Sequence, residues 1–280
     1  MGGKKQPEET PLMKQYHEIK EQNKNAILFF RMGDFYEMFH EDAIVASKIL
    51  GISLTSRDRN SPNPVPLCGI PYHAVDVYLT KMIKAGQRVA ICEQVEDPKT
   101  AKGIVKRKVI RIVSPGTVID QTQIISEDSN HIFTITKQGK YVGVSFVELT
   151  TGEFYGAEFH EKSKKKIIDF LGQQSFSEVV VTSSTLSYLN EILREVNKEK
   201  VCVTTVEDWY FDKNLTGKIL KEHFQVLALD GFGLSEKDAL IVAAGGLLNY
   251  LKDTQQSELK HIETIRVVEI NSFMSLDFST

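Results

Sequence analysis

Cysteine is scarce in this sequence of 280 residues, and the three that occur lie far apart. Cys68, Cys92 and Cys202 form no Cys-x-x-Cys pair, and their neighbours are mostly apolar. A zinc site would have to gather its ligands from several separate elements, which is rarer than the packing of small side chains in a core. We therefore expect buried thiols and no metal ion.

Long apolar runs and phosphate-binding loops are also missing. No stretch approaches the ~20 apolar residues that cross a bilayer. The pattern Gly-x-x-x-x-Gly-Lys-Ser/Thr occurs nowhere, and neither Gly231-Phe232-Gly233 nor Gly245-Gly246 can replace it. We expect a cytoplasmic chain that has no membrane segment, binds no cofactor and does not hydrolyse ATP.

Charge is unevenly divided along the chain. Hydrophobic residues make up 41% and charged residues 25%, as in ordinary globular proteins, and the length fits two domains. The first 112 residues contain 18 Lys and Arg against 13 Asp and Glu, a net charge of +5, whereas the rest contains 16 against 24, a net charge of −8. The basic part is therefore expected to contact a polyanion, and the acidic part to stay away from it.

Residues 1–114 are expected to fold as one mixed-sheet domain. Thr10 can cap a helix whose first turn holds Pro11, and Gly51 stands where a helix ends in left-handed backbone. Residues 56–66 contain three prolines, which predicts an exposed loop without a strand ladder. Helices are expected over 11–23, 40–50 and 74–84, and strands over 26–32, 35–39, 88–94 and 104–113.

Residues 131–250 show a different pattern, in which three alternating strands are followed by helices that alternate with further strands. This order predicts a ribonuclease H-like three-layer α/β/α domain and makes the whole chain α/β. Residues 115–130 are expected to be a linker, and 251–280 the start of a truncated third unit. The strands are expected over 131–136, 141–149, 153–159, 178–182 and 201–206, and the last helix over 235–251.

One short segment suggests a function. If residues 35–39 form a strand, Phe35 and Glu37 point the same way. An aromatic ring can wedge into a step of duplex DNA while a neighbouring carboxylate meets an exposed base edge. By spacing alone, a Phe35 in the core and a solvated Glu37 remain the commoner arrangement.

A run of basic residues could hold the DNA backbone. It places five cations within ten residues and includes no acid, and Arg31, Arg57 and Arg59 could add to it. Each of these charges could instead be solvated on a sheet face, and we regard Arg57 and Arg107 as the first candidates. The run consists of Lys102, Lys106, Arg107, Lys108 and Arg111.

The segment Gly33-Asp34-Phe35-Tyr36-Glu37-Met38-Phe39 resembles the Phe-X-Glu motif of the MutS family of mismatch-repair proteins. The likeness extends through the first domain and is thinner in the second, where it rests on Gly231-Phe232-Gly233 and the run from Leu248 to Gln255. The other matching segments are Thr10-Pro11-Leu12-Met13, Ser53-Leu54-Thr55, Gly69-Ile70-Pro71-Tyr72-His73-Ala74, Ile91-Cys92-Glu93-Gln94 and Lys106 to Thr117.

The resemblance implies a DNA-binding module and not an enzyme. Phe35 would stack on a mispaired base of double-stranded DNA, and Glu37 would hydrogen-bond that base. Residues 131–250 would be the family's connector domain, and 251–280 would begin its core or lever domain. In such proteins, later parts of the chain contain the ATP and Mg²⁺ site and the homodimer contacts. The resemblance also implies a MutL-type repair partner.

Two other functions stay open. A metal-dependent nuclease could use Glu148, Glu153 and Asp169 of the ribonuclease H-like domain, although 131–136 contains no carboxylate, which favours a structural use of that fold. The second alternative is a MutS relative that binds branched DNA instead of mismatches. Such relatives generally lack the Phe-X-Glu pair, which argues against this alternative. Tyr72-His73 is expected to be a packed aromatic with a capping histidine, without chemistry.

Overall fold

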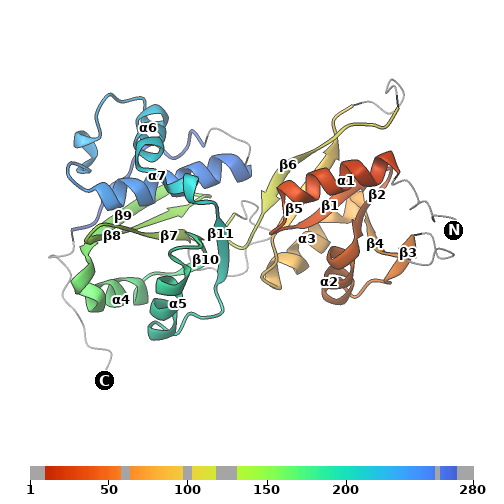
Figure 1. Cartoon of the computed structure of the whole chain (residues 1–280), viewed down its shortest axis with the longest axis horizontal. Helices are drawn as coiled ribbons and strands as arrows, with labels where there is room; N and C mark the ends of the chain where they lie inside the picture. Colours follow the sequence, from red (N-terminus) through yellow and green to blue (C-terminus); the bar gives the residue numbers. More distant parts are fainter. Residues whose placement is uncertain (1–9, 58–63, 97–102, 118–130, 256–258, 270–280) are drawn as a thin grey trace, which may run out of the picture. The chain divides into compact units, whose positions relative to one another are not determined.

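The computed structural model describes residues 10–57, 64–96, 103–117, 131–255 and 259–269. The chain divides into two compact units, Met1–Ser114 and Pro115–Thr280, each built from helices and one six-stranded mixed sheet (Figure 1). The α/β class expected from the sequence is therefore confirmed. Within the described ranges, no helix is both long and apolar enough to span a membrane.

The sheet of the first unit has the strand order β3-β4-β2-β1-β5-β6. β1 and β5 are parallel, and the other neighbours are antiparallel. The strands are β1 (Ile27–Met32), β2 (Phe35–Phe39), β3 (Thr55–Arg57), β4 (Val65–Pro71), β5 (Val89–Gln94) and β6 (Arg107–Val113). The helices are α1 (Pro11–Gln22), α2 (His40–Leu50), the 3-10 turn η1 (Tyr72–Ala74) and α3 (Val75–Lys84).

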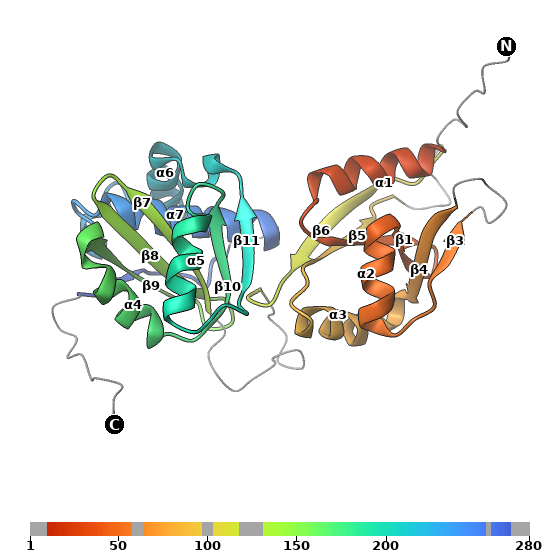
Figure 2. The ribbon, with the colours of Figure 1, turned by 60° about the horizontal axis from the view of Figure 1, so that its bottom comes forward.

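Helices cover both faces of this sheet, α1 on one side and α2 with α3 on the other (Figure 2). Thr10 Oγ1 accepts from the Met13 backbone N–H at 3.4 Å, and Gly51 ends α2 with φ +67°, so both predicted helix ends are confirmed. Tyr16 of α1 packs edge-on against Phe30 and Phe39, with ring centroids 5.5 and 4.9 Å apart. These contacts fix α1 over β1 and β2.

The predicted loop over 56–66 is wrong at both ends. β3 pairs with β4, and Ser56 lies opposite Pro66. The ladder tolerates Pro66 because β4 pairs with β2 only from Leu67 onward, so the missing proline N–H is not needed on that side. Residues 58–63, among them Arg59, lie outside the described residues.

The second unit is the expected three-layer arrangement, with the strand order β11-β10-β7-β8-β9-β12 (Figure 1). β7, β8 and β9 are antiparallel, whereas β10 runs parallel to β7 and to β11. The strands are β7 (His131–Gln138), β8 (Tyr141–Glu148), β9 (Glu153–His160), β10 (Phe176–Thr182), β11 (Cys202–Val206) and β12 (Arg266–Val267). The helices are η3 (Glu161–Ser163), α4 (Lys164–Gly172), α5 (Leu186–Glu195), η4 (Asp208–Phe211), α6 (Lys213–Phe224), η5 (Asp230–Phe232) and α7 (Asp238–Gln255).

One hydrophobic core lies on each face of this sheet. Side chains of α4 and α5 pack on one face, while those of α6 and α7 pack on the other. The glycine pair of α7 serves close packing: a Cβ on Gly246 would stand 2.3 Å from Phe211 Cδ1, and one on Gly245 2.5 Å from the Thr216 carbonyl oxygen. Cys68 and Cys92 are buried and Cys202 is half-buried, all as free thiols.

The second unit extends beyond the boundaries that we expected. α7 continues past residue 250 to Gln255, β12 pairs with β9, and Leu259, Ile262 and Ile265 are buried in the same core as Leu248. Residues 251–255 and 259–269 therefore belong to the second unit and do not begin a third one. At the other end Thr117 is buried, so the expected linker is packed where it begins; residues 118–130 and 270–280 lie outside the described ranges.

Candidate nucleic-acid interface

The β1–β2 hairpin presents the Phe-X-Glu segment. Gly33 turns the chain with φ +59°, and the register places Met32 opposite Phe35 and Phe30 opposite Glu37. Phe35 and Glu37 consequently share the sheet face that carries Phe30. The Phe35 side chain is 47% exposed, a costly position for a large apolar ring, and Glu37 is half-buried. Spacing alone favours a position in the core for Phe35, but the ring lies at the surface.

The carboxyl group of Glu37 is held in an environment that favours its neutral form. Burial raises the pKa of Glu37, and the positive charge of Arg57 on β3 partly offsets this effect. Arg57 also reaches α1, where its Nη1 lies 4.0 Å from Met13 Sδ. A protonated carboxyl group beside an exposed ring can donate one hydrogen bond as well as accept others.

Arg107, a first candidate from the sequence, points into the fold. Its Nε donates to the Arg31 carbonyl oxygen at 2.6 Å, and its Nη1 donates to Gln15 Oε1 at 3.0 Å. The guanidinium also lies 5.0 Å from the centre of the Phe30 ring. Burial lowers the pKa of Arg107. These contacts tie β6 to β1 and α1, and therefore favour a structural role for this arginine.

Arg31 lies on the opposite sheet face from Phe35, in a network that sequence reasoning missed. Its Nη1 lies 3.4 Å from Glu93 Oε1, and its guanidinium stacks 3.7 Å from the centre of the Tyr72 ring. The Tyr36 hydroxyl donates to the same Glu93 oxygen. The turn at Gly33 could have predicted the Arg31–Tyr36 pair, since it fixes the hairpin register. Tyr72 is 40% exposed, and its ring packs on the Arg31 guanidinium.

The basic run separates into inward and outward side chains along the last strand of the sheet. Arg107 and Val109 are half-buried, whereas Lys106, Lys108 and Ile110 are exposed. Lys106 forms a surface ion pair with Glu96, with Nζ and Oε1 3.3 Å apart. Lys102 lies outside the described residues. Among the described residues of this run, Lys106 and Lys108 are thus the exposed cations, and Arg111 is half-buried like Arg107.

Of the carboxylates considered for a nuclease, Glu148 and Glu153 are used in local structure, and Asp169 lies on the separate helix α4. Glu148 and Glu153 lie opposite each other where β8 turns into β9. Glu148 accepts from the backbone N–H groups of Thr150 and Thr151 at 3.0 and 2.7 Å; although burial opposes ionisation, these bonds lower its pKa. Across the described ranges, no group of three or more His, Cys, Asp or Glu side chains is placed to hold a metal ion.

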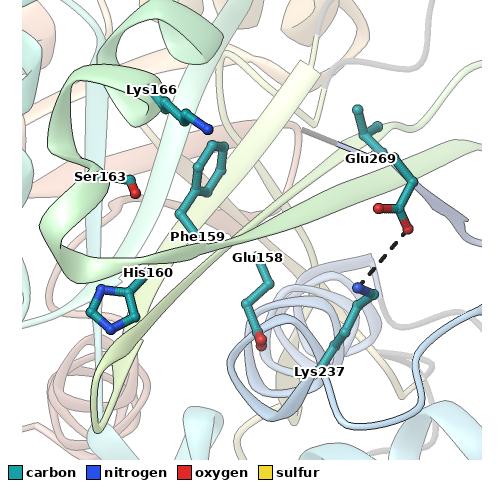
Figure 3. A pocket seen from close by; sticks show the side chains of 8 residues that line it. Glu158, Phe159, His160, Ser163, Lys166, Lys237 and Glu269 are labelled. Carbon is teal, nitrogen blue, oxygen red and sulfur yellow. Dashed lines mark ion pairs between the residues drawn. The ribbon is translucent and has the colours of Figure 1, made fainter. Parts of the chain in front are cut away.

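The second unit also has an open pocket of about 240 Å³ between β9, α4 and the segment that follows β12 (Figure 3). Glu158 reaches from β9 to the start of α7, where its Oε2 accepts from the N–H groups of Ala239 and Leu240 at 2.7 and 3.1 Å. Lys237 lies 4.0 Å from Glu269 across the pocket. The carboxylate of Glu158 therefore caps a helix, and the geometry indicates no reaction here.

Comparisons with known proteins agree with the order of the two units. Residues 10–122 match the family model described as MutS domain I, and residues 130–263 match MutS domain II. The chain is 44% identical over 271 residues to the DNA mismatch repair protein MutS of Lachnoclostridium phytofermentans, covering 97% of the chain and 29% of that relative. It is 43% identical over 276 residues to that of Thermodesulfovibrio yellowstonii, covering 98% and 31%. The chain thus spans about three tenths of the length of these curated relatives, and it belongs to the MutS family, whose domains I and II it matches.

Proposed function

We propose that this chain acts in DNA mismatch repair and that its first unit tests duplex DNA for mispaired bases with Phe35 and Glu37. The observation that carries the proposal is the half-exposed Phe35 ring, which shares one sheet face with a carboxyl group whose pKa is raised. Insertion of an apolar wedge unstacks a base step at a cost of a few kcal/mol, and a mispaired step costs less. The wedge therefore selects deformable sites.

Glu37 would increase the discrimination between mismatched and matched DNA. An ionised carboxylate near phosphates costs free energy, and only a displaced base edge that offers a donor offsets that cost. The neutral form, which burial of Glu37 favours, can instead donate to a purine nitrogen. Both forms favour an unpaired base over a Watson–Crick pair, because the pairing edges of paired bases are already hydrogen-bonded to each other.

The exposed lysines would supply affinity without sequence preference. We assign backbone phosphate contacts to Lys106 and Lys108, with Arg57 beside Glu37 as a third cation. Arg31 and Arg107 would act indirectly, since their guanidinium groups hold the strands that carry the wedge.

The second unit would be a connector that relays the state of the reader. Its net negative charge suits a domain that does not lie on DNA. We propose three further properties for a whole protein of the relatives' length, of which this chain spans about three tenths. They are binding of ATP and Mg²⁺, pairing with a second copy and docking of a MutL-type protein.

The test measures binding of a G·T heteroduplex and of the matched homoduplex at one fixed salt concentration. We expect the chain to prefer the heteroduplex and Phe35→Ala to lose the preference. Leu54→Ala is the matched control, because Leu54 is an equally exposed apolar side chain, at 49%, in the same unit. If Phe35→Ala discriminates as well as the unchanged chain, the proposal is wrong.

A further inference from the structure

Two histidines from separate helices converge on the surface of the first unit. His17 lies on α1, and His40 is the first residue of α2. Their Nε2 atoms are 3.1 Å apart and their ring centroids 5.2 Å apart, so these nitrogens lie between the two rings. Two facing N–H groups would clash at this distance, and therefore at least one Nε2 presents a lone pair to the other.

The separation of the two nitrogens suits a shared metal ion. With metal–nitrogen bonds of about 2.0–2.1 Å, two imidazole nitrogens stand about 3.3 Å apart in tetrahedral geometry and about 2.9 Å apart in square-planar geometry. The 3.1 Å between His17 and His40 lies between these values. Small rotations of the rings would let both lone pairs meet at one ion, without any movement of the backbone.

The backbone at His40 is a second, independent observation. His40 adopts φ +53°, in the left-handed region that residues with a Cβ rarely occupy. Strained backbone of this kind persists where the surrounding structure imposes it, and it concentrates at binding and catalytic sites. In this position the His40 ring turns toward α1, while an ion pair of 2.9 Å between the half-buried Lys20 and the buried Asp42 fixes the same two helices to each other.

We propose that His17 and His40 form a two-histidine site for a divalent transition-metal ion such as Zn²⁺. Imidazole prefers Zn²⁺, Cu²⁺ and Ni²⁺ to Mg²⁺ or Ca²⁺. Among the described residues, no third His, Cys, Asp or Glu side chain joins the pair, so the two imidazoles are the ligands that we assign. The bound ion clamps α1 to the junction of β2 and α2, three residues after Glu37. This site does not depend on the proposed function.

The test is calorimetric titration of the full chain with Zn²⁺, together with thermal unfolding in Zn²⁺ and in EDTA. We expect one site, and a melting temperature that rises with Zn²⁺ concentration. His17→Gln and His40→Asn should each weaken binding by more than about tenfold, since loss of even an indirect partner of a metal ligand costs roughly 10–100-fold. Asn tolerates the left-handed backbone at position 40.

His73→Ala is the matched control, since it removes another exposed histidine of the same unit and should leave Zn²⁺ affinity unchanged. Melting in EDTA shows that each variant is folded. The proposal is overturned if the unchanged chain does not bind Zn²⁺, or if either folded variant binds it as tightly as the unchanged chain. Equal loss of binding in His73→Ala would also overturn it.

Discussion

Gly69 of β4 lies directly opposite Glu37 of β2, and its missing side chain leaves room for the side chains of Phe35 and Glu37. A Cβ built on Gly69 would stand 3.6 Å from Glu37 Cγ and 3.9 Å from Phe35 Cδ1. These are ordinary van der Waals distances, so one added methyl group would fit. Any longer side chain would extend over the face that Phe35 and Glu37 share.

The first prediction concerns this position. Gly69→Ala should keep the fold and gain up to about 0.5–1 kcal/mol, because alanine loses less backbone entropy than glycine in a strand. Gly69→Leu should remain folded but lose much of the heteroduplex preference, since its side chain covers the shared face. Urea unfolding and duplex binding check the two effects. Full preference in Gly69→Leu would show that DNA does not use this face.

The second prediction is a pH dependence that originates at Glu37. Burial raises the folded-state pKa of Glu37 above its unfolded value, so its contribution to stability is present at acidic pH and is lost as the pH rises through the folded-state pKa. Glu37→Gln removes this loss. The stability of the variant relative to the unchanged chain should therefore increase as the pH rises above the ordinary pKa range of a glutamate.

Urea unfolding at several pH values measures that gain, and Glu18→Gln on the exposed side of α1 is the control. A gap between Glu37→Gln and the unchanged chain that shrinks toward neutral pH would contradict the assigned direction of the pKa shift.

The third prediction separates two neighbouring cations of β6. Arg107→Ala should destabilise the first unit by about 1–3 kcal/mol, because it removes charged hydrogen bonds to Arg31 and Gln15. Lys108→Ala should leave stability within about 0.5 kcal/mol and reduce the salt dependence of DNA binding by about 0.9 in log–log slope, as expected for one phosphate contact. An unchanged slope in Lys108→Ala would remove Lys108 from the interface.

The fourth prediction concerns the fully buried carboxylate of Glu178. It accepts from Thr204 Oγ1 at 2.6 Å, from the Tyr250 hydroxyl at 2.8 Å and from the Gly116 N–H at 3.3 Å, and so joins β11, α7 and the entry to the second unit. Glu178→Ala should cost about 3 kcal/mol, because these donors lose an acceptor away from water.

Tyr250→Phe should cost about 1 kcal/mol, and Glu199→Ala on the exposed surface should cost less than about 0.5 kcal/mol. Denaturant unfolding gives all three values. If Glu178→Ala is no less stable than Glu199→Ala, the buried carboxylate does not hold these elements together.

Local signals predicted most of the secondary structure. The Thr10 cap, the Gly51 helix end and the five strands expected between residues 131 and 206 depend on neighbours in sequence, and each is found there. The helix α6 was not predicted. The alternation of a strand also put Phe35 and Glu37 on one face. It could not show that Phe35 is exposed, because burial depends on what the other elements cover.

The sequence by itself determined most of the helices and strands, although not β3, β4 or α6, together with the α/β class and the shared face of Phe35 and Glu37, because these follow from periodicity and turn residues over short stretches. Only the tertiary structure decided that Arg107 points inward, that Leu259, Ile262 and Ile265 belong to the second core, and that His17 meets His40. The contacts of long side chains and of terminal segments are made with elements far away in sequence, and a local sequence pattern does not predict such contacts.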